Sequence, residues 1–263
     1  MRMRMGLSFV LICVASLSAQ DLCAQDMLQG VDLAQPAYSK AELTRADIEA
    51  ALLRRESGHK IDLSEKSLNG LDLSGLDLHG VDFHAARMNK TSLAGARLDD
   101  AILDQAWLIE ADLTGASLKG AHAFASQMQR IKADGADFTH ARLAGDLTGA
   151  SARGANFSEA DLSADMKNQS MGLMRAVLRS AVLEGARFHK ANLASADLRF
   201  VRAAGADFSE ANLKGADAAG ADLTGANWAG AKTDGLDLDS AQIDLAASAA
   251  LAGAQNLDRA RVK

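Results

Sequence analysis

The chain is poor in the residues that hold small folds together covalently or fill large aromatic cores. Its 263 residues include two cysteines, one proline and 4% aromatic residues. Because Cys13 and Cys23 both lie near the N-terminus, disulfides cannot form the framework of the rest of the chain. With so few aromatic side chains, the core has to be built mainly from leucine and alanine.

The sequence also lacks the residue patterns that support catalysis or binding driven by charge. Its net charge of −6 is mild and by itself indicates neither nucleic acid nor a membrane as a partner. No paired nucleophile and base, phosphate-binding loop or cluster of cysteine and histidine is present. We therefore predict that the protein is not an enzyme and has no cofactor and no metal site.

A five-residue repeat dominates the chain over residues 61–245 and is clearest over residues 206–228. The unit reads small-apolar, Asp or Asn, large-apolar, Ser, Thr or Lys, and Gly. A period of five fits neither the 3.6 residues of a helical turn nor the two-residue alternation of a strand. The repeat therefore predicts a solenoid that turns a corner once per unit, and a solenoid offers extended surfaces more readily than clefts.

Two slips interrupt the repeat. Leu143 and Leu147 lie one residue closer together than a full unit, which predicts a tightened corner. Leu162 and Leu173 are separated by one residue more than two units, which predicts a bulge. Exposed irregularities on rigid scaffolds often carry function, so the bulge is a candidate contact. The residues assigned to it are Asp165, Met166, Lys167, Asn168, Gln169 and Ser170.

This repeat resembles that of the pentapeptide repeat proteins. The resemblance implies an all-β solenoid, a right-handed quadrilateral β-helix of about nine coils, in which four units make one coil and the large-apolar residue points inward. Residues twenty apart should then stack, so Phe188, Phe208 and Trp228 should form an internal aromatic ladder. Phe138 and Phe157 should form a shorter one. In better known members the C-terminal end dimerises, which implies a homodimer here.

The N-terminus has the layout of a secretory signal peptide. A basic start is followed by an apolar run over residues 6–17 and by small residues, with cleavage expected between about Ser18 and Ala24. The apolar run is too short to cross a bilayer as a permanent helix. We therefore expect a periplasmic or secreted protein without a stable membrane span. The alternative is an apolar tail on a cytosolic protein.

The ends of the solenoid are expected to be covered, because a bare last coil exposes apolar side chains and unpaired backbone. Ser39 and Glu42 have the spacing of a capping box, and residues 40–55 are predicted to be helical. Residues 242–251 are predicted to form a short capping helix, and residues 254–257 a last strand. The predicted segments are a signal peptide (1–24), a linker and helix (25–60), the repeat (61–245) and a C-terminal cap (246–263).

Large apolar residues at outward positions are informative because the repeat does not need them there. Clusters of exposed aromatic and aliphatic side chains are typical of protein-binding patches. A patch covered by a terminal segment is the alternative. The candidate binding residues are Ile102, Trp107, Ile109, Phe124 and Phe200.

Two functions compete at this point. We favour a non-catalytic extracytoplasmic scaffold that binds another protein, of unknown identity, through its outer walls, with no nucleic-acid partner. The alternative comes from the resemblance, because some members mimic DNA and bind or protect DNA gyrase in the cytoplasm. Residues 171–205 disfavour such mimicry, since they carry six basic residues against Glu184 and Asp197. Arg179 and Arg199 should even lie one above the other.

Overall fold

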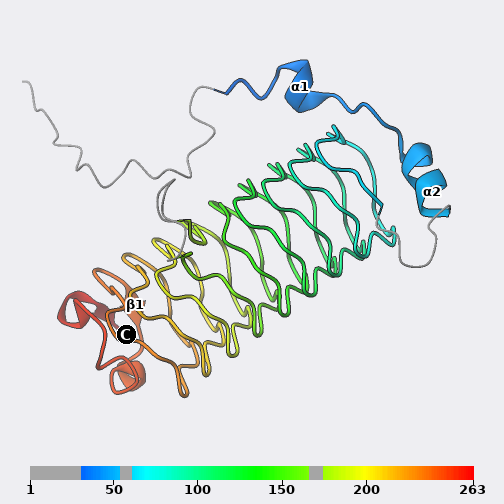
Figure 1. The fold of residues 1–263 in the computed structure, drawn as a ribbon. Coiled ribbons are helices and arrows are strands. Elements are labelled where there is room, and N and C mark those ends of the chain that lie inside the picture. The colour runs from blue at the N-terminus through cyan, green and yellow to red at the C-terminus, as the bar shows by residue number, and fades with distance from the viewer. Residues whose placement is uncertain (1–30, 54–60, 166–173) are drawn as a thin grey trace, which may run out of the picture.

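The computed structural model describes residues 31–53, 61–165 and 174–263, which wind into a stack of coils (Figure 1). Helices α1 (Pro36–Ser39) and α2 (Arg45–Leu53) lie by the first coils, and strand β1 (Gln242–Ile243) lies at the far end. The predicted signal peptide and residues Met166 to Ser170 of the predicted bulge lie outside the described ranges.

Parallel bridges between stacked coils form four ladders, one on each side of the solenoid. We number the walls 1 to 4 in chain order; their first ladder residues are Asp62, Ser67, Asp72 and Asp77. In the regular coils each ladder residue pairs with the residue twenty positions later, which confirms the four-unit coil. The ladder of wall 2 runs through Ser67, Arg87, Trp107, Gln127, Asp146, Val177, Asp197, Asp217, Asp237 and Gln255.

The core is a narrow column of leucine, alanine and phenylalanine. Within the repeat, the residue after each described ladder position is buried, as Leu68, Leu73 and Leu78 show. The predicted aromatic ladder is confirmed, and its two parts are continuous. Phe138, Phe157, Phe188, Phe208 and Trp228 stack in succession with ring centroids 4.8 to 5.1 Å apart.

The corners rely on the Asp or Asn of the repeat. Asp137 Oδ1 accepts a hydrogen bond from the backbone N–H of Thr139, two residues on, at 3.0 Å. Burial opposes the ionisation of Asp137, but the hydrogen bonds from Thr139, together with the hydrogen bond and positive charge of Lys119, outweigh it and lower the pKa of that carboxyl. The side chain therefore replaces a backbone partner at the turn.

The termini differ from the expected caps. The capping box lies at Thr44 and Asp47 and not at Ser39 and Glu42, because Asp47 Oδ2 accepts from the backbone N–H of Thr44 at 2.8 Å while Asp47 N–H donates to Thr44 Oγ1. Helix α2 accordingly begins at Arg45. Ser39 instead ends α1.

At the C-terminal end no α-helix forms among the described residues. Two 3-10 helices, Leu245–Ala247 and Leu257–Arg259, cover the last coil together with strand β2 (Arg261–Val262), which pairs with β1 in parallel. Gln255 bridges Asp237, so the predicted last strand contributes one ladder position.

Both slips of the repeat lie at the same corner, between walls 1 and 2. The tightened corner runs from Arg142 to Asp146. On the next coil, sixteen residues separate Asp161 on wall 1 from Val177 on wall 2, where a regular corner uses five. Among the described residues Leu178 follows Leu162 as the next inward centre, and Leu173, which was predicted to be a centre, lies outside the described ranges. Between the described residues on either side of residues 166–173, Asp165 N–H donates a hydrogen bond to the carbonyl of Met174 at 2.8 Å.

Gly145 makes the tightened corner possible. A Cβ at this position would lie 2.6 Å from Ser126 Oγ and 2.7 Å from the carbonyl oxygen of Ser126. Because this corner is one residue shorter than the others, its backbone lies against Ser126 of the preceding coil. A side chain at position 145 would clash there, so only glycine fits.

Candidate interaction wall

Wall 2 differs from the other three walls in the burial of its outward side chains. Among the described residues, ladder residues are buried only on this wall. Among the described residues, the residue two positions after a ladder residue is also buried only on wall 2. The one exception is Ala144, which lies at the shortened corner that leads into wall 2. The buried outward residues of wall 2 are Ser67, Asn69, Asn89, Ile109, Gln127, Gln129, Val177 and Asp197.

In the first coils, wall 2 is covered by residues 31–44, which we call the N-terminal strap. Ser67 Oγ donates to the carbonyl of Lys40, and Asn89 Nδ2 donates to the carbonyl of Tyr38 at 3.2 Å. The backbone N–H of Glu42 donates to the carbonyl of Ser67 at 2.8 Å. These bonds all reach main-chain atoms of the strap.

Two asparagines on wall 2 take the place of the usual corner residue. The ladder residues Arg87 and Trp107 cannot supply the acceptor that Asp supplies elsewhere. Asn69 Oδ1 instead accepts from Asn89 N–H at 2.9 Å, and Asn89 Oδ1 accepts from Ile109 N–H at 3.1 Å. The amide groups of both asparagines remain available to the strap.

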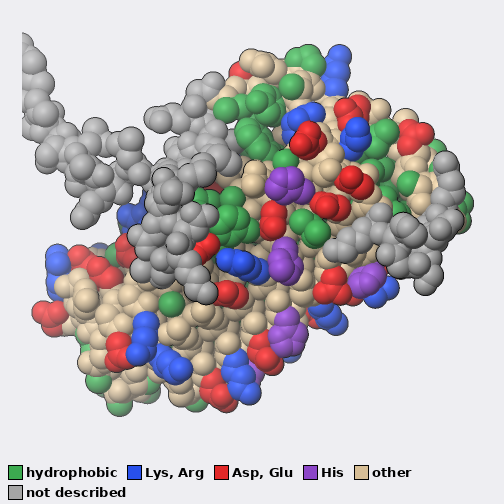
Figure 2. Space-filling model, viewed as in Figure 1, with side chains coloured by type: hydrophobic (Ala, Val, Ile, Leu, Met, Phe, Trp, Pro, Cys, Tyr) green, Lys and Arg blue, Asp and Glu red, His purple; other side chains and the backbone are tan. Residues whose placement is uncertain are grey.

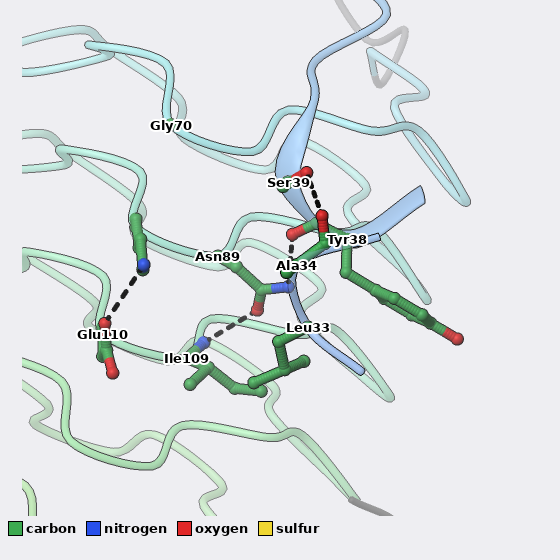
Figure 3. A pocket seen from close by; sticks show the side chains of 9 residues that line it. Leu33, Ala34, Tyr38, Ser39, Gly70, Asn89, Ile109 and Glu110 are labelled. Carbon is green, nitrogen blue, oxygen red and sulfur yellow. Dashed lines mark hydrogen bonds and ion pairs between the residues drawn. The ribbon is translucent and has the colours of Figure 1, made fainter. Parts of the chain in front are cut away.

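The strap contacts the wall on both sides of this asparagine column. The Tyr38 ring stacks on Trp107 with centroids 5.1 Å apart and planes 17° apart. On the other side, a cavity of about 460 Å³ remains between strap and wall. Figure 3 shows Leu33 beside Ile109 at this cavity, with Asn89 between strap and wall and the Tyr38 ring pointing away. The strap therefore forms hydrogen bonds with Ser67, Asn69 and Asn89 of the wall without filling the apolar space beside Ile109.

Further along wall 2, arginines surround the buried Asp197. Arg179 Nη2 and Arg199 Nη2 lie 3.1 and 2.7 Å from Asp197 Oδ2, and Arg175 Nη2 lies 3.8 Å away. Burial opposes the ionisation of Asp197, but hydrogen bonds and positive charge from Arg199, with Arg179, outweigh it and lower the pKa. Arg179 and Arg199, which were predicted to lie one above the other, both pair with the Asp197 carboxylate, and this shared contact offsets their repulsion.

Asp197, Asp217 and Asp237 form a column of carboxylates on wall 2. Burial raises the pKa of Asp217, and the charges of Asp197 and Asp237 add to the effect. No group of three or more His, Cys, Asp or Glu residues suited to a metal ion occurs in the described parts of the chain. The column is therefore explained by corner hydrogen bonds and arginine pairing.

Phe200 is the exposed aromatic residue at the end of this arginine cluster, with 58% of its surface accessible. It occupies a corner position with φ of 58°. Its ring lies over Gly220 of the next coil, where a Cβ would come within 2.6 Å of the ring. One face of the ring is thus supported by backbone while the other is open to a partner.

The predicted binding cluster is divided by the structure. Trp107 is half-buried and Ile109 is buried, both beneath the strap, so the alternative of a covering terminal segment holds for these two residues. Ile102 belongs to wall 1. Phe124 lies at the corner between walls 1 and 2, where the guanidinium of Arg142 sits 5.3 Å from its ring centroid. Arg142 Nη2 also lies 3.9 Å from Asp165 Oδ2 at the loop base.

Sequence reasoning missed Tyr38, Asn69 and Asn89. The asparagines look like ordinary repeat residues, and only their shift by two positions from the usual Asp site signals a different role. On the face shown in Figure 2, acidic, basic and histidine side chains are interspersed. The C-terminal homodimer stays a prediction, and Leu245 and Val262 are exposed at that end.

The described helices include none that is both long and apolar enough for a transmembrane span.

The chain matches the family model described as Pentapeptide repeats in eight copies, over residues 91–123, 126–164, 173–209 and 191–227. A search of curated proteins found no match.

Solved structures of pentapeptide repeat proteins resemble this chain. One is HetL, involved in heterocyst differentiation regulation in the cyanobacterium Nostoc sp. strain PCC 7120, with 24% identity, coverage of 76% of this chain and 96% of HetL, and a TM-score of 0.30. Another is QnrB1, a plasmid-mediated fluoroquinolone resistance protein, with 20% identity, coverage of 80% and 86%, and a TM-score of 0.39. A thylakoid lumen protein of Arabidopsis thaliana shows 25% identity, coverage of 56% and 70%, and a TM-score of 0.19. Because these TM-scores are low, we draw no functional argument from the likenesses.

Proposed function

The chain belongs to the pentapeptide repeat family, and from that premise we propose that it is a non-catalytic extracytoplasmic protein that binds another protein through wall 2. Proteins of this family adopt a right-handed quadrilateral β-helix and are generally structural or interaction proteins. The finer features of this proposal, namely export and the choice of wall, rest on the residues of this chain.

The observation that carries the proposal is the burial pattern of wall 2. All four walls use the same backbone ladder, so the fold itself does not require any wall to be covered. Only wall 2 has buried ladder residues among those described, and in its first coils a segment of polypeptide covers it. Wall 2 is thus already a protein-binding surface toward the protein's own chain.

Further along wall 2, beyond the strap, the outward side chains have the composition of an interface. Phe200 is exposed beside Arg199, and Arg179 lies one coil away. Aromatic and arginine side chains are enriched among the residues that dominate binding at protein interfaces. The ion pairs with Asp197 hold the arginines in place, so less side-chain freedom is lost when a partner docks.

Gyrase binding is the competing function, and cellular location separates the two. Residues 1–30 fused to a reporter enzyme that is active only after export should give an active reporter, because a basic start followed by an apolar run directs secretion. The matched control carries Val10→Arg and Ile12→Arg, which interrupt the apolar run and should abolish activity. An inactive reporter with the native leader would contradict export and restore the gyrase alternative.

The choice of wall is tested by photo-crosslinking in cells. A photoreactive amino acid replaces Phe200 on wall 2 or, as the matched control, Glu210 on wall 4, which occupies an equivalent corner with φ of 56°. Position 200 should give a discrete crosslinked product that position 210 does not. Equal crosslinking at both positions would show that the partner does not select wall 2.

A further inference from the structure

We propose that wall 2 between Ser67 and Ile109 is a groove that binds a linear polypeptide segment carrying an aromatic and an acidic side chain. The N-terminal strap occupies this groove and is displaced when such a segment binds. The proposal rests on the proposed function and names the chemistry of the partner.

The groove forms hydrogen bonds with main-chain atoms of the segment that occupies it. The main-chain atoms of the strap that bond to the wall are the carbonyls of Ala37, Tyr38 and Lys40 and the N–H of Glu42. The wall groups that bind them are the hydroxyl and carbonyl of Ser67 and the amides of Asn69 and Asn89. Because every polypeptide carries such groups, a segment from another protein can make the same bonds.

The aromatic slot supplies selectivity. Trp107 stands at a ladder position where the repeat ordinarily carries a small polar or charged residue, and Tyr38 stacks on it. The stack adds nothing to the coil interior, since both rings lie outside the column of buried residues. Trp107 therefore selects a segment with an aromatic residue at the place of Tyr38.

An acidic residue in the partner would satisfy a group that the strap leaves without a bond. Arg87 lies between Ser67 and Trp107 in the ladder. Its Nε is buried and has no hydrogen-bond partner within the described parts of the chain. A buried donor of this kind is costly, and a carboxylate is the strongest acceptor for a guanidinium.

The strap fits the groove incompletely, so a partner can bind better. It leaves the cavity of about 460 Å³ beside Ile109, and the strap residues that line this cavity include the small Ala34 and Ser39 besides Leu33 and Tyr38. None of the residues of α1 is buried. A segment with a larger apolar side chain at the place of Ala34 would fill the space and displace the strap.

The test uses the full chain and labelled synthetic peptides with the sequence of residues 31–44. In a Tyr38→Ala protein the resident strap is weakened, and the peptide should bind saturably in fluorescence anisotropy, about tenfold more tightly than to the wild type, where the strap competes. A peptide carrying Ala34→Phe should bind roughly threefold or more tighter still, because it fills the cavity.

Two double variants control the site. Tyr38→Ala with Trp107→Ala should lose peptide binding, whereas Tyr38→Ala with Phe200→Ala, which removes an aromatic side chain elsewhere on the same wall, should retain it. Trp107→Phe should restore part of the binding, which separates loss of the ring from loss of the fold. Far-ultraviolet circular dichroism checks each variant.

Binding no tighter than that of a scrambled peptide, or binding that survives Trp107→Ala, would overturn the proposal. Such a result would leave the proposed function standing if position 200 still crosslinks to a partner. Conversely, peptide binding without export or crosslinking would preserve the groove and remove the extracytoplasmic role.

Discussion

Walls 2 and 4 are built on the same kind of backbone ladder but differ in the burial and the type of their outward side chains. On wall 4 every ladder residue is exposed or half-buried, and all are small polar or charged residues: Asp77, Arg97, Ser117, Asp137, Asn156, Arg187, Asp207 and Asn227. On wall 2 four ladder residues are buried and one is tryptophan. Since the backbone is shared, the difference lies in what each wall meets outside the coil.

The two walls also differ in where they carry their aromatic residues, inside the coil on wall 4 and outside it on wall 2. The interior of wall 4 carries the continuous aromatic stack from Phe138 to Trp228. Wall 2 carries its aromatic residues, Trp107 and Phe200, on the outside. Ring burial inside the coil stabilises the fold, whereas rings outside it are free to contact another chain.

The largest expected effect is on wall 4. Phe188→Ala removes a fully buried ring between Phe157 and Phe208 and should lower the free energy of unfolding by about 3–5 kcal/mol. Urea denaturation followed by circular dichroism measures the loss. Phe200→Ala on wall 2 is the control and should change stability by about 0.5 kcal/mol or less. Comparable losses of stability at the two positions would contradict the claim that the inner rings of wall 4, and not the outer rings of wall 2, stabilise the fold.

A smaller effect is expected at the corner that leads into wall 2. Gly145→Ala places a methyl group against Ser126 and should cost roughly 1–3 kcal/mol of folding free energy. Gly75→Ala is the contrasting control, because its Cβ would meet no atom within 4 Å while its φ of 69° lies in the left-handed region, so its cost reports turn conformation without crowding. Thermal unfolding should show the larger loss at position 145. If Gly75→Ala costs as much, turn conformation and not crowding governs the corner.

The smallest effect concerns the charge of wall 2. Because the pKa of Asp217 is raised in the folded state, chiefly by burial, its contribution to stability is fully present below the unfolded pKa of about 3.8 and is lost as the pH rises through the folded pKa. Asp217→Asn should therefore raise stability at pH 7, by less than about 1 kcal/mol, and the gain should vanish near pH 3.

Urea midpoints of wild type and variant across this pH range measure the change. A variant less stable than wild type at pH 7 would mean that the contact between Arg199 Nε and Asp217 Oδ2, at 3.4 Å, outweighs the cost of burial.

Much of the fold was predictable because the repeat is local and strict. The inward positions and the twenty-residue stacking of Phe188, Phe208 and Trp228 follow from the resemblance of this repeat to that of the pentapeptide repeat proteins, in which four units make one coil. The length of the insertion after Leu162 was misjudged, since sixteen residues and not five separate Asp161 on wall 1 from Val177 on wall 2, while Leu173 continues a period of five in the sequence. A period alone does not show whether a unit takes part in the ladder.

The candidate site was less predictable because it joins segments far apart in the chain. Trp107 and Ile109 were identified as outward residues that the repeat does not need, but their cover was not assigned. Tyr38 lies in a segment without a repeat, where no pattern indicates what it packs against. The capping box was misplaced for a similar reason, since Ser39 and Glu42 match its spacing as well as Thr44 and Asp47 do.

The sequence by itself determined a four-sided coil and the identity of its inward side chains, because each unit repeats the same local turn and places the same residue types inside. Only the tertiary structure decided which wall is covered. That choice depends on where a non-repeating segment packs, and on how a deletion and an insertion fall at one corner. Such contacts depend on the shape and polarity of surfaces brought together by the completed stack, which no five-residue pattern encodes.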